Sequence, residues 1–571
     1  MNLTPNDRIA GLLAPLFALR TENDLGIGDV EALRQFIDWA RPLGFRLIQL
    51  LPINETGGDN SAYNAISSRA IDPTTLYLAP GSPSELTQEI FDEVTAGIDL
   101  AALRRGVVHY EIVKPLKKKL LERAFLGFAK GAPNESFAEF CRDESGWLDD
   151  YTLFRVLMEL HGEREMWDEW PQNNLPAARA WLDSLGESER AEIEQRRELF
   201  RYVQWLAHAQ WTALKSFAEE RGVALMGDIP FGVSYYSADV FAHPESFALD
   251  WSGGAPPEPY FKDDEFTQKW GQNWGIPIYN WPQMRGDHFA WWRQRVRGVK
   301  EIFHLFRIDH ILGFYRIYAF PWRPARNAEI LPLTWEEMLA QTGGRAPQFA
   351  PRDDNSPAHA EQNRRDGEEY LRVVLDEAGA TCVVGEDLGT VPDYVRPNLQ
   401  SLGIAGFKIP QWETDQHQQT IAGGSYERLS VATFATHDHK PVRALWEEAF
   451  EKESETAEQA RQDLNKMADF AGISPPNEST NYAREFYPAI LEALFRSESW
   501  IAIVMITDLL GRKDRYNVPG TAADSNWTRR LHTTVAKLGG GRALRNRLHL
   551  VHELLKKAGR ISPPTDTDFH R

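Results

Sequence analysis

Residues 367–389 read GEEYLRVVLDEAGATCVVGEDLG, and this stretch shows the unit from which the chain is built. Residues 367–377 have the pattern of an amphipathic helix, and residues 381–384 form a short apolar run. The run ends in an acidic pair between glycines, Gly385-Glu386-Asp387-Leu388-Gly389. The pattern predicts a helix, then a buried strand, then a polar turn where the strand finishes.

The same unit recurs along the chain. An amphipathic helix precedes a short apolar run at residues 30–43 and 45–51, 196–220 and 223–226, 393–402 and 406–409, and 488–496 and 501–506. Further buried strands are expected at residues 9–19, 302–308 and 429–435. Alternating helices and buried strands predict parallel βα units.

We therefore predict an α/β fold, a (β/α)8 TIM-type barrel with its active site at the carboxyl ends of the strands. A doubly wound open sheet is the alternative, because it also binds ligands at strand ends. No G-x-G-x-x-G motif follows the first strand, which disfavours a dinucleotide fold. Residues 1–571 are expected to form one catalytic barrel, with a helical insertion subdomain at residues 95–200 and a polar insertion loop at residues 340–366.

Composition narrows the classes of partner. The formal net charge of −19 disfavours a nucleic acid or an anionic membrane, because an acidic surface repels both. Residues 9–19 are too few to span a bilayer, which needs about 20 apolar residues. Two cysteines, Cys141 and Cys382, form neither a disulfide framework nor a structural zinc site. We expect a cytoplasmic protein, and the sequence does not determine its oligomeric state.

The first candidate for catalysis lies in Phe306-Arg307-Ile308-Asp309-His310. Alternate residues of a strand share a face, so Arg307 and Asp309 are expected to point the same way, towards the barrel mouth. A nearby guanidinium favours the charged carboxylate, and a nucleophile must be ionised at neutral pH. The alternative is an ordinary ion pair at the end of a strand.

The second candidate is Glu386, which follows the apolar Val383 and Val384. A partly buried carboxyl group near a second carboxylate has a raised pKa, as a general acid requires. The alternative is a capping acid before the next helix.

The third candidate is Asp438 in Thr436-His437-Asp438-His439. Adjacent strand residues point to opposite faces, so His437 and Asp438 are poorly placed to chelate one metal ion. A transition-state role for Asp438, binding sugar hydroxyl groups, is the better hypothesis. Three acids on three strands fit retaining glycosyl transfer, in which one carboxylate attacks the anomeric carbon and another protonates the leaving oxygen.

A set of motifs in a shared order resembles the amylomaltase (4-alpha-glucanotransferase, disproportionating) family, relatives of the alpha-amylases. The matching stretches lie between Gly26 and Leu531: Gly26-Ile27-Gly28-Asp29, Leu51-Pro52-Ile53, Ser61-Ala62-Tyr63, Gly227-Asp228-Ile229-Pro230, Ser237-Ala238-Asp239-Val240, Trp274-Gly275-Ile276-Pro277-Ile278-Tyr279-Asn280-Trp281, Arg307-Ile308-Asp309-His310, Gly385-Glu386-Asp387-Leu388-Gly389, Thr436-His437-Asp438, Asn517-Val518-Pro519-Gly520-Thr521 and Asn526-Trp527.

The resemblance implies the roles of the site residues. Asp309 is implied as the nucleophile, Glu386 as the acid/base and Asp438 as the transition-state stabiliser. The remaining residues are implied to bind substrate: Arg307, His437 and Asp228 at the donor sugar, Tyr63 stacked under it, and Tyr260, Phe261 and Trp274 on a loop over the acceptor side. The implied substrates are maltooligosaccharides and alpha-1,4-glucans, and neither a cofactor nor a metal is expected.

Departures from the family pattern fall at Ile276, at Tyr235-Tyr236 and at His439-Lys440-Pro441. The aromatic density from Trp251 to Trp281 agrees with an acceptor-side role, and the aromatic loop near Trp274 favours transfer over hydrolysis, because rings stack on an incoming sugar. Two alternatives stay open: an alpha-1,4-glucan hydrolase of the alpha-amylase type and a catalytically silent glucan-binding protein.

Overall fold

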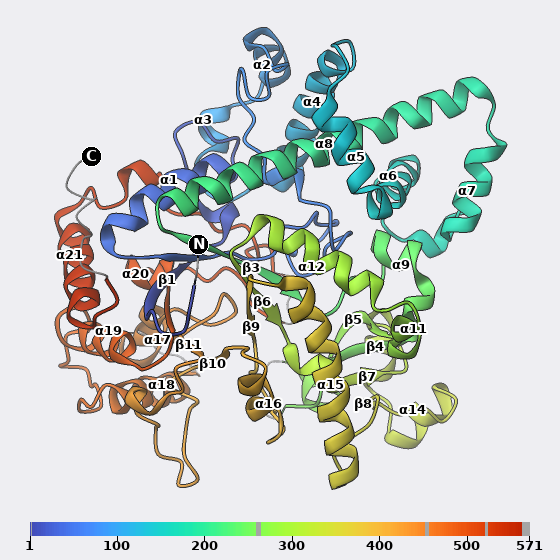
Figure 1. The fold of residues 1–571 in the computed structure, drawn as a ribbon. Helices are drawn as coiled ribbons and strands as arrows, with labels where there is room; N and C mark the ends of the chain where they lie inside the picture. The colour runs from blue at the N-terminus through green and yellow to red at the C-terminus, as the bar shows by residue number, and fades with distance from the viewer. Residues whose placement is uncertain (2, 259–263, 452–455, 520–522, 562–571) are drawn as a thin grey trace.

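Eight parallel strands form the centre of the molecule (Figure 1). A computed structural model describes residues 1, 3–258, 264–451, 456–519 and 523–561. The strands are β1 Ile9–Leu13, β2 Leu47–Gln49, β3 Ala224–Pro230, β6 Leu305–Asp309, β9 Cys382–Gly385, β10 Gly406–Lys408, β11 Ser430–Ala432 and β12 Ile501–Met505. Their order is β10-β11-β12-β1-β2-β3-β6-β9. A parallel bridge between Val384 and Ala405 links the two ends, and the predicted (β/α)8 barrel is confirmed.

The barrel core explains the apolar runs of the sequence. The five residues of β1 and the five of β12 are all buried, as are residues 224–229 of β3. Strands buried on both faces have few polar positions, so they appear as continuous hydrophobic runs. Gly227 in β3 has no room for a side chain, because a Cβ atom there would lie 2.3 Å from the Phe303 ring. This close packing fixes the strand next to Asp228.

Helices between the barrel strands, and one after β12, form the outer layer. They are α1 Val30–Ala40, α8 Glu187–Glu220, α12 Ala290–Ile302, α15 Pro357–Ala378, α16 Val395–Ser401, α17 Val442–Phe450, α18 Ala457–Phe470, α19 Tyr487–Arg496 and α21 Arg542–Lys557. Neighbours such as α1 and α8, α8 and α12, and α12 and α15 pack side by side. Helix α1 stops three residues before the predicted end, because Pro42 turns residues Arg41–Leu43 into a 3-10 turn.

A group of helices stands beside the barrel between β2 and β3. It contains α2 Gln88–Thr95, α3 Leu100–Leu103, α4 Tyr110–Phe128, α5 Glu135–Asp143, α6 Ser145–Leu160 and α7 Leu175–Ser184, and the long α8 returns to the barrel (Figure 1). Helix α6 packs on α8, and its residues Leu148–Met158 are mostly buried. These helices occupy most of the segment predicted as a helical insertion.

A second, antiparallel sheet lies next to the barrel in the order β5-β4-β7-β8. Its strands are β4 Phe247–Ala255, β5 Gln272–Tyr279, β7 Ile317–Phe320 and β8 Gln348–Ala350. Between β7 and β8 lies α14 Trp335–Gln341. The sequence did not predict this sheet, because its two longest strands, β4 and β5, are only partly buried, contain glycines and show neither a continuous apolar run nor a regular alternation.

The prediction of a polar loop at residues 340–366 is wrong. Strand β8 pairs with β7 within it, and α15 begins at Pro357. The Ser356 side chain caps this helix by accepting the His359 N–H at 3.2 Å, and Pro357 fits the first helical position. Within the described residues, no helix is long and apolar enough to cross a lipid bilayer.

Candidate active site

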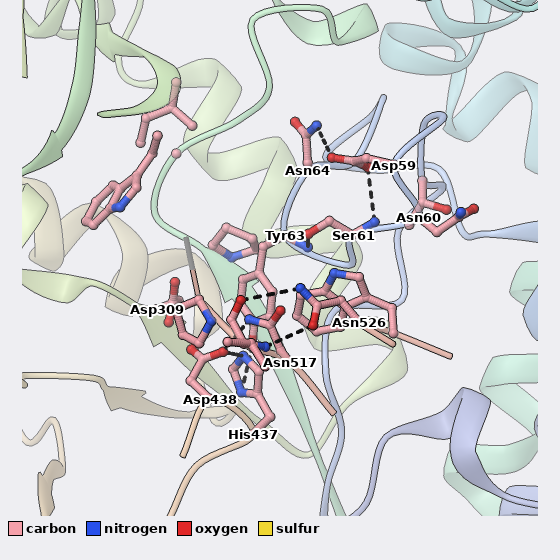
Figure 2. A pocket seen from close by; sticks show the side chains of 18 of the residues that line it. Asp59, Asn60, Ser61, Tyr63, Asn64, Asp309, His437, Asp438, Asn517 and Asn526 are labelled. Carbon is pink, nitrogen blue, oxygen red and sulfur yellow. Dashed lines mark hydrogen bonds and ion pairs between the residues drawn. The ribbon is translucent and has the colours of Figure 1, made fainter. Parts of the chain in front are cut away.

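A cleft of about 3260 Å³ opens at the carboxyl ends of the barrel strands, and the three candidate acids Asp309, Glu386 and Asp438 all line it. Figure 2 shows Asp309 and Asp438 in this cleft with His437, Asn517 and Tyr63. The acids come from three different strand ends, namely β6, β9 and the turn beyond β11. Residues that are far apart in sequence therefore share one opening.

Arg307 joins two carboxylates at the floor of the cleft. Its Nη1 atom donates to both oxygens of Asp228, at 2.8 and 2.7 Å, and its Nη2 donates to Asp309 Oδ1 at 2.6 Å. The predicted common face of Arg307 and Asp309 is confirmed. The Arg307 side chain is almost wholly buried, whereas the Asp309 side chain keeps 30% of its surface exposed. The guanidinium therefore orients Asp309 from below and leaves the rest of its carboxylate facing the cleft.

Asp228 lies below the cleft. Its side chain is completely buried, and burial raises its pKa although Arg307 opposes the shift. Asp228 is not among the residues that line the cleft, but its carboxylate accepts hydrogen bonds from Arg307 and Tyr63, which do line it. It acts on the site through its hydrogen bonds with these two residues.

Tyr63 lines the cleft from the loop that follows β2. Its hydroxyl group donates to Asp228 Oδ2 at 2.6 Å, and its ring stacks on His437 with centroids 4.8 Å apart and planes 8° apart. Trp527 lies at a tilt to both rings. The three aromatic rings form a wall against which the apolar face of a sugar can pack.

Glu386 is held by two backbone N–H groups. The Oε2 atom accepts the His310 N–H at 2.8 Å, and the Oε1 atom accepts the Leu388 N–H at 3.1 Å. Burial, together with the negative charge of Asp309, raises the pKa of Glu386 to about 8. Its carboxyl group can therefore hold a proton at neutral pH, as expected for a general acid.

Asp438 has a different environment. Asn517 donates to its Oδ1 atom at 2.6 Å, and His437 Nε2 lies 3.2 Å from the same oxygen. Burial alone would raise the pKa of Asp438, but His437 and the Asn517 hydrogen bond outweigh it and hold the pKa below its usual value. This acid stays ionised while Glu386 is protonated, so the two carboxyl groups have separate roles.

His437 and Asp438 lie in a turn beyond β11, so the expected strand geometry, with side chains on opposite faces, is wrong. The turn brings the two side chains into contact. Within the described residues, no group of three or more His, Cys, Asp or Glu side chains could hold a metal ion.

Only one of the three residues predicted on the aromatic loop lies within the described residues. Tyr260 and Phe261 lie outside the described residues. Trp274 lies in strand β5, not in a loop, and it is 39% exposed at the cleft. Its ring meets the edge of His310 with centroids 4.8 Å apart. Trp274 therefore reaches the residue next to Asp309 from the second sheet.

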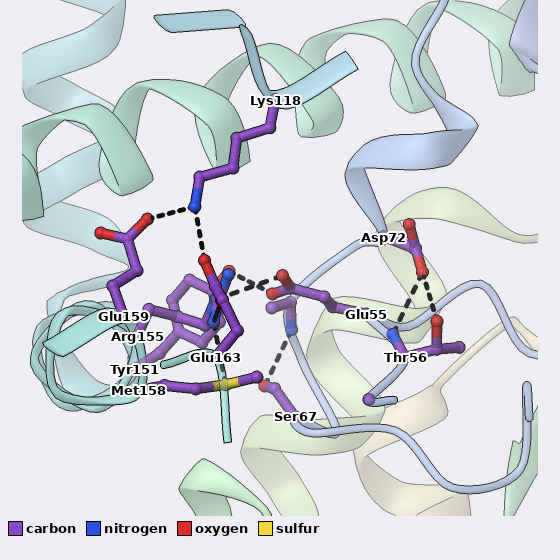
Figure 3. Close-up of polar contacts among 12 residues, drawn as sticks. Glu55, Thr56, Ser67, Asp72, Lys118, Tyr151, Arg155, Met158, Glu159 and Glu163 are labelled. Carbon is purple, nitrogen blue, oxygen red and sulfur yellow. Dashed lines mark hydrogen bonds and ion pairs between the residues drawn. The ribbon is translucent and has the colours of Figure 1, made fainter. Parts of the chain in front are cut away.

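Sequence reasoning missed a buried ionic cluster at the base of the Tyr63 loop (Figure 3). Glu55 accepts the Tyr151 hydroxyl at 2.5 Å and lies 3.2 Å from Arg155 Nε, and both charged side chains are nearly buried. Glu55 also accepts the Ile66 N–H through its carbonyl at 2.8 Å, which closes the loop that carries Tyr63. Helix α6 thus fixes the base of the loop that carries Tyr63. Its two contacts with Glu55 join residues 96 and 100 positions apart, so no local sequence pattern indicated them.

A closed (β/α)8 barrel with three carboxyl groups and an aromatic wall in one cleft defines an enzyme that acts on glycosides. Comparison with known proteins gives the particular family. The family described as 4-alpha-glucanotransferase matches residues 14–535. The chain belongs to this family and is a glycosyl-transferring enzyme.

Relatives with the same description cover nearly the whole chain. The 4-alpha-glucanotransferase of Chlamydia caviae is 32% identical over 545 residues, which cover 92% of this chain and 91% of that protein. The 4-alpha-glucanotransferase of Thermus thermophilus is 30% identical over 539 residues, which cover 92% of this chain and 95% of that protein. The family match and these relatives confirm the predicted 4-alpha-glucanotransferase activity.

Two solved structures share the fold. The amylomaltase from Streptococcus agalactiae in complex with acarbose has a TM-score of 0.71 at 22% identity, covering 97% of this chain and 100% of that chain. The amylomaltase from Corynebacterium glutamicum has a TM-score of 0.74 at 20% identity, covering 96% of this chain and 75% of that chain.

Proposed function

We propose that this enzyme transfers alpha-1,4-glucan segments with retention of configuration, with Asp309 as nucleophile, Glu386 as acid/base and Asp438 as transition-state stabiliser. The observation that carries the proposal is the register of β6 and β9, in which Ile308 lies opposite Gly385. Asp309 and Glu386 are the next residues on these neighbouring strands. Backbones of neighbouring strands lie about 4.8 Å apart, so both side chains start close enough to reach the roughly 5–5.5 Å carboxyl separation of retaining enzymes.

In the first step, Asp309 Oδ forms a bond to the anomeric carbon while the glycosidic bond to the leaving oxygen breaks. Glu386 transfers its proton to that oxygen, and the shortened glucan leaves with a free 4-hydroxyl group. The products are a glycosyl ester on Asp309 and an ionised Glu386. Asp438, already ionised, would stabilise the positive charge that develops on the sugar ring.

The raised pKa of Glu386 also explains how the same group can then act as a base. Part of that shift comes from the charge on Asp309. Once Asp309 is esterified, that charge is gone and the pKa of Glu386 falls. Glu386 then accepts the proton of an incoming 4-hydroxyl group, whose oxygen bonds to the anomeric carbon as the ester bond breaks.

The identity of the acceptor decides between transfer and hydrolysis. Trp274 gives the acceptor side an exposed ring beside His310, which supports binding of a sugar in preference to water. Arg307, His437 and Tyr63 would hold the donor sugar, with Asp228 acting through Arg307 and Tyr63. We include Tyr260 and Phe261 as acceptor-side residues on the basis of the family resemblance alone.

Incubation with maltotriose tests this function. Transfer yields a ladder of longer maltooligosaccharides together with glucose, while the number of reducing ends stays constant. A steady rise in reducing ends would instead identify an alpha-1,4-glucan hydrolase. Binding without any new product would identify a catalytically silent glucan-binding protein.

We also propose a cytoplasmic location. The proposal rests on the two free cysteines, Cys141 and Cys382, which are compatible with a reducing compartment. Cell fractionation tests it, and recovery of the activity from the medium or from an extracytoplasmic fraction would contradict it.

A further inference from the structure

Three tryptophan side chains in the described part of the chain are at least 39% exposed: Trp274 at 39%, Trp412 at 46% and Trp335 at 50%. Trp274 and Trp412 line the cleft, whereas Trp335 lies outside its lining. A ligand that covers such a large ring would recover the hydrophobic free energy that its exposure forgoes. A position in the cleft therefore accounts for the exposure of Trp274 and Trp412 but not for that of Trp335.

The Trp335 ring is held rigidly. Trp335 is the first residue of α14, where Thr334 caps the helix and a reciprocal hydrogen bond with Glu337 completes the cap. Its ring stacks on the buried Trp270, with centroids 6.0 Å apart and planes 19° apart. Trp270 in turn packs edge-on against Trp322. With one face on Trp270, Trp335 presents a fixed aromatic surface to solvent.

This surface continues from the wall of the cleft. Trp270 directly follows α10 Glu265–Lys269, and Phe266 and Thr267 of α10 line the cleft. Asn327, which also lines the cleft, accepts the Trp322 indole N–H at 3.0 Å. The stacked pair of Trp270 and Trp335 is therefore the outward continuation of the wall that meets the substrate.

The size and surroundings of Trp335 favour a sugar over a protein partner. A stable protein interface buries about 800 Å² per partner, whereas one tryptophan side chain contributes at most about 250 Å². The next two residues of α14, Glu336 and Glu337, are exposed and acidic, so polar groups adjoin the ring along the helix. A neutral glucan needs one ring for its apolar face and polar groups around it.

We propose that Trp335 is a second binding site for α-glucan, outside the catalytic cleft, which holds a distant part of a long chain while the cleft acts on another part. The choice of glucan as ligand rests on the proposed function. Short substrates cannot occupy both places at once, so the site acts only on long chains.

The test compares Trp335→Ala with Leu160→Ala, since Leu160 is 56% exposed on α6 and also lies outside the cleft lining. For long-chain amylose as donor, with maltose as acceptor, Trp335→Ala is expected to raise KM roughly 3–10-fold. Its kinetic constants with maltotriose should match those of the wild type. In native gels containing amylopectin, the wild type and Leu160→Ala should be retarded, and Trp335→Ala should run faster than both.

Equal KM values for amylose in Trp335→Ala and the wild type would overturn the proposal. Loss of activity on maltotriose would also overturn it, because the effect would then belong to the cleft. A fall in molecular mass of Trp335→Ala in analytical ultracentrifugation would show that a second copy of the chain covers the ring. Maltotriose transfer by the wild type tests the proposed function separately, so the two failures are distinguishable.

Discussion

The Oε2 atom of Glu386 accepts the backbone N–H of His310 at 2.8 Å, which binds the candidate acid to the residue that follows the candidate nucleophile. His310 has a left-handed backbone conformation, with φ of 50°. This conformation is uncommon for a residue with a side chain, and it persists where surrounding contacts stabilise it. The strained turn after β6 thus couples the positions of Asp309 and Glu386.

Asp309→Ala is expected to abolish glucan transfer, with kcat reduced by at least about 10³-fold, because no other group replaces the attacking carboxylate. The fold should persist, since Arg307 keeps both hydrogen bonds to Asp228. Rates of maltotriose disproportionation and thermal unfolding check both statements. Asp250→Ala is the control, because Asp250 is exposed and pairs with Arg345 away from the cleft. Near-normal turnover by Asp309→Ala would exclude Asp309 as the nucleophile.

Glu386→Gln separates the role of the acid from substrate binding. The amide cannot donate a proton to the leaving oxygen, so cleavage of natural glucans should fall by about 10²–10⁴-fold. A glycosyl fluoride needs no such proton, and the first step with this donor should survive. Burst kinetics with both donors measure the difference. An equal loss with both donors would show that Glu386 does not act chiefly as the acid.

The pH profile should show the titration of Glu386. With its pKa raised to about 8 by burial and by the charge of Asp309, the free enzyme holds the required proton below that pH and loses it above. The value of kcat/KM for maltotriose should therefore fall as pH rises through about 8. With a glycosyl fluoride this alkaline decline should be absent or shifted upward. A decline near pH 5 to 6 as pH rises would contradict the assignment, because Glu386 would then have an ordinary pKa.

Much of the barrel was predictable, since buried parallel strands are short apolar runs. Each of the eight barrel strands overlaps a run found in the sequence. The first turns of α15 were not predictable from the sequence, because a helix that is polar on nearly all sides lacks an apolar stripe. Those turns are stabilised instead by ion pairs of Arg364 with Glu361 and Glu368.

The sequence indicated the types of the site residues and their positions along the chain, but not how deeply each side chain is buried. Strand ends and motifs indicated Asp228, Asp309, Glu386 and Asp438 without showing that Asp228 lies beneath Arg307. Contacts across the fold, such as the hydrogen bond from Asn517 to Asp438, depend on the path of the intervening chain. Periodicity describes only local structure, so such pairs need coordinates or a family resemblance.

Tyr63→Phe tests the hydroxyl group, which donates to Asp228 and lies 3.4 Å from His437 Nδ1, separately from the aromatic ring. Loss of the hydroxyl group leaves the ring stacked on His437 but weakens the support of a buried carboxylate, which should cost about 1–2 kcal/mol of unfolding free energy and lower kcat/KM roughly 10-fold. Tyr63→Ala, which also removes the ring, should lower it further. Tyr487→Phe is the matched control, because its buried hydroxyl donates to the Asp508 carbonyl at 2.7 Å outside the cleft. A similar loss of activity in that control would remove any specific role for the Tyr63 hydroxyl.

Arg155→Met tests whether helix α6 supports the loop that carries Tyr63. Removal of one partner of a buried ion pair costs about 3–5 kcal/mol, because the other charge stays buried and unpaired. Arg190→Met, which breaks an exposed pair with Asp183, should cost no more than about 1 kcal/mol. Chemical denaturation measures both values, and KM for maltotriose should rise only in Arg155→Met.

The pH dependence of the Arg155→Met effect distinguishes an unpaired charge from lost packing. Burial already raises the pKa of Glu55 above its usual value, and loss of Arg155 should raise it further. A group whose pKa is raised in the folded state contributes stability at low pH and loses it as pH rises. The deficit of Arg155→Met should therefore shrink towards pH 5 and grow towards pH 8, and Glu55→Gln in the same chain should remove this dependence. A deficit that is constant with pH would mean that Arg155 supports the loop by packing alone.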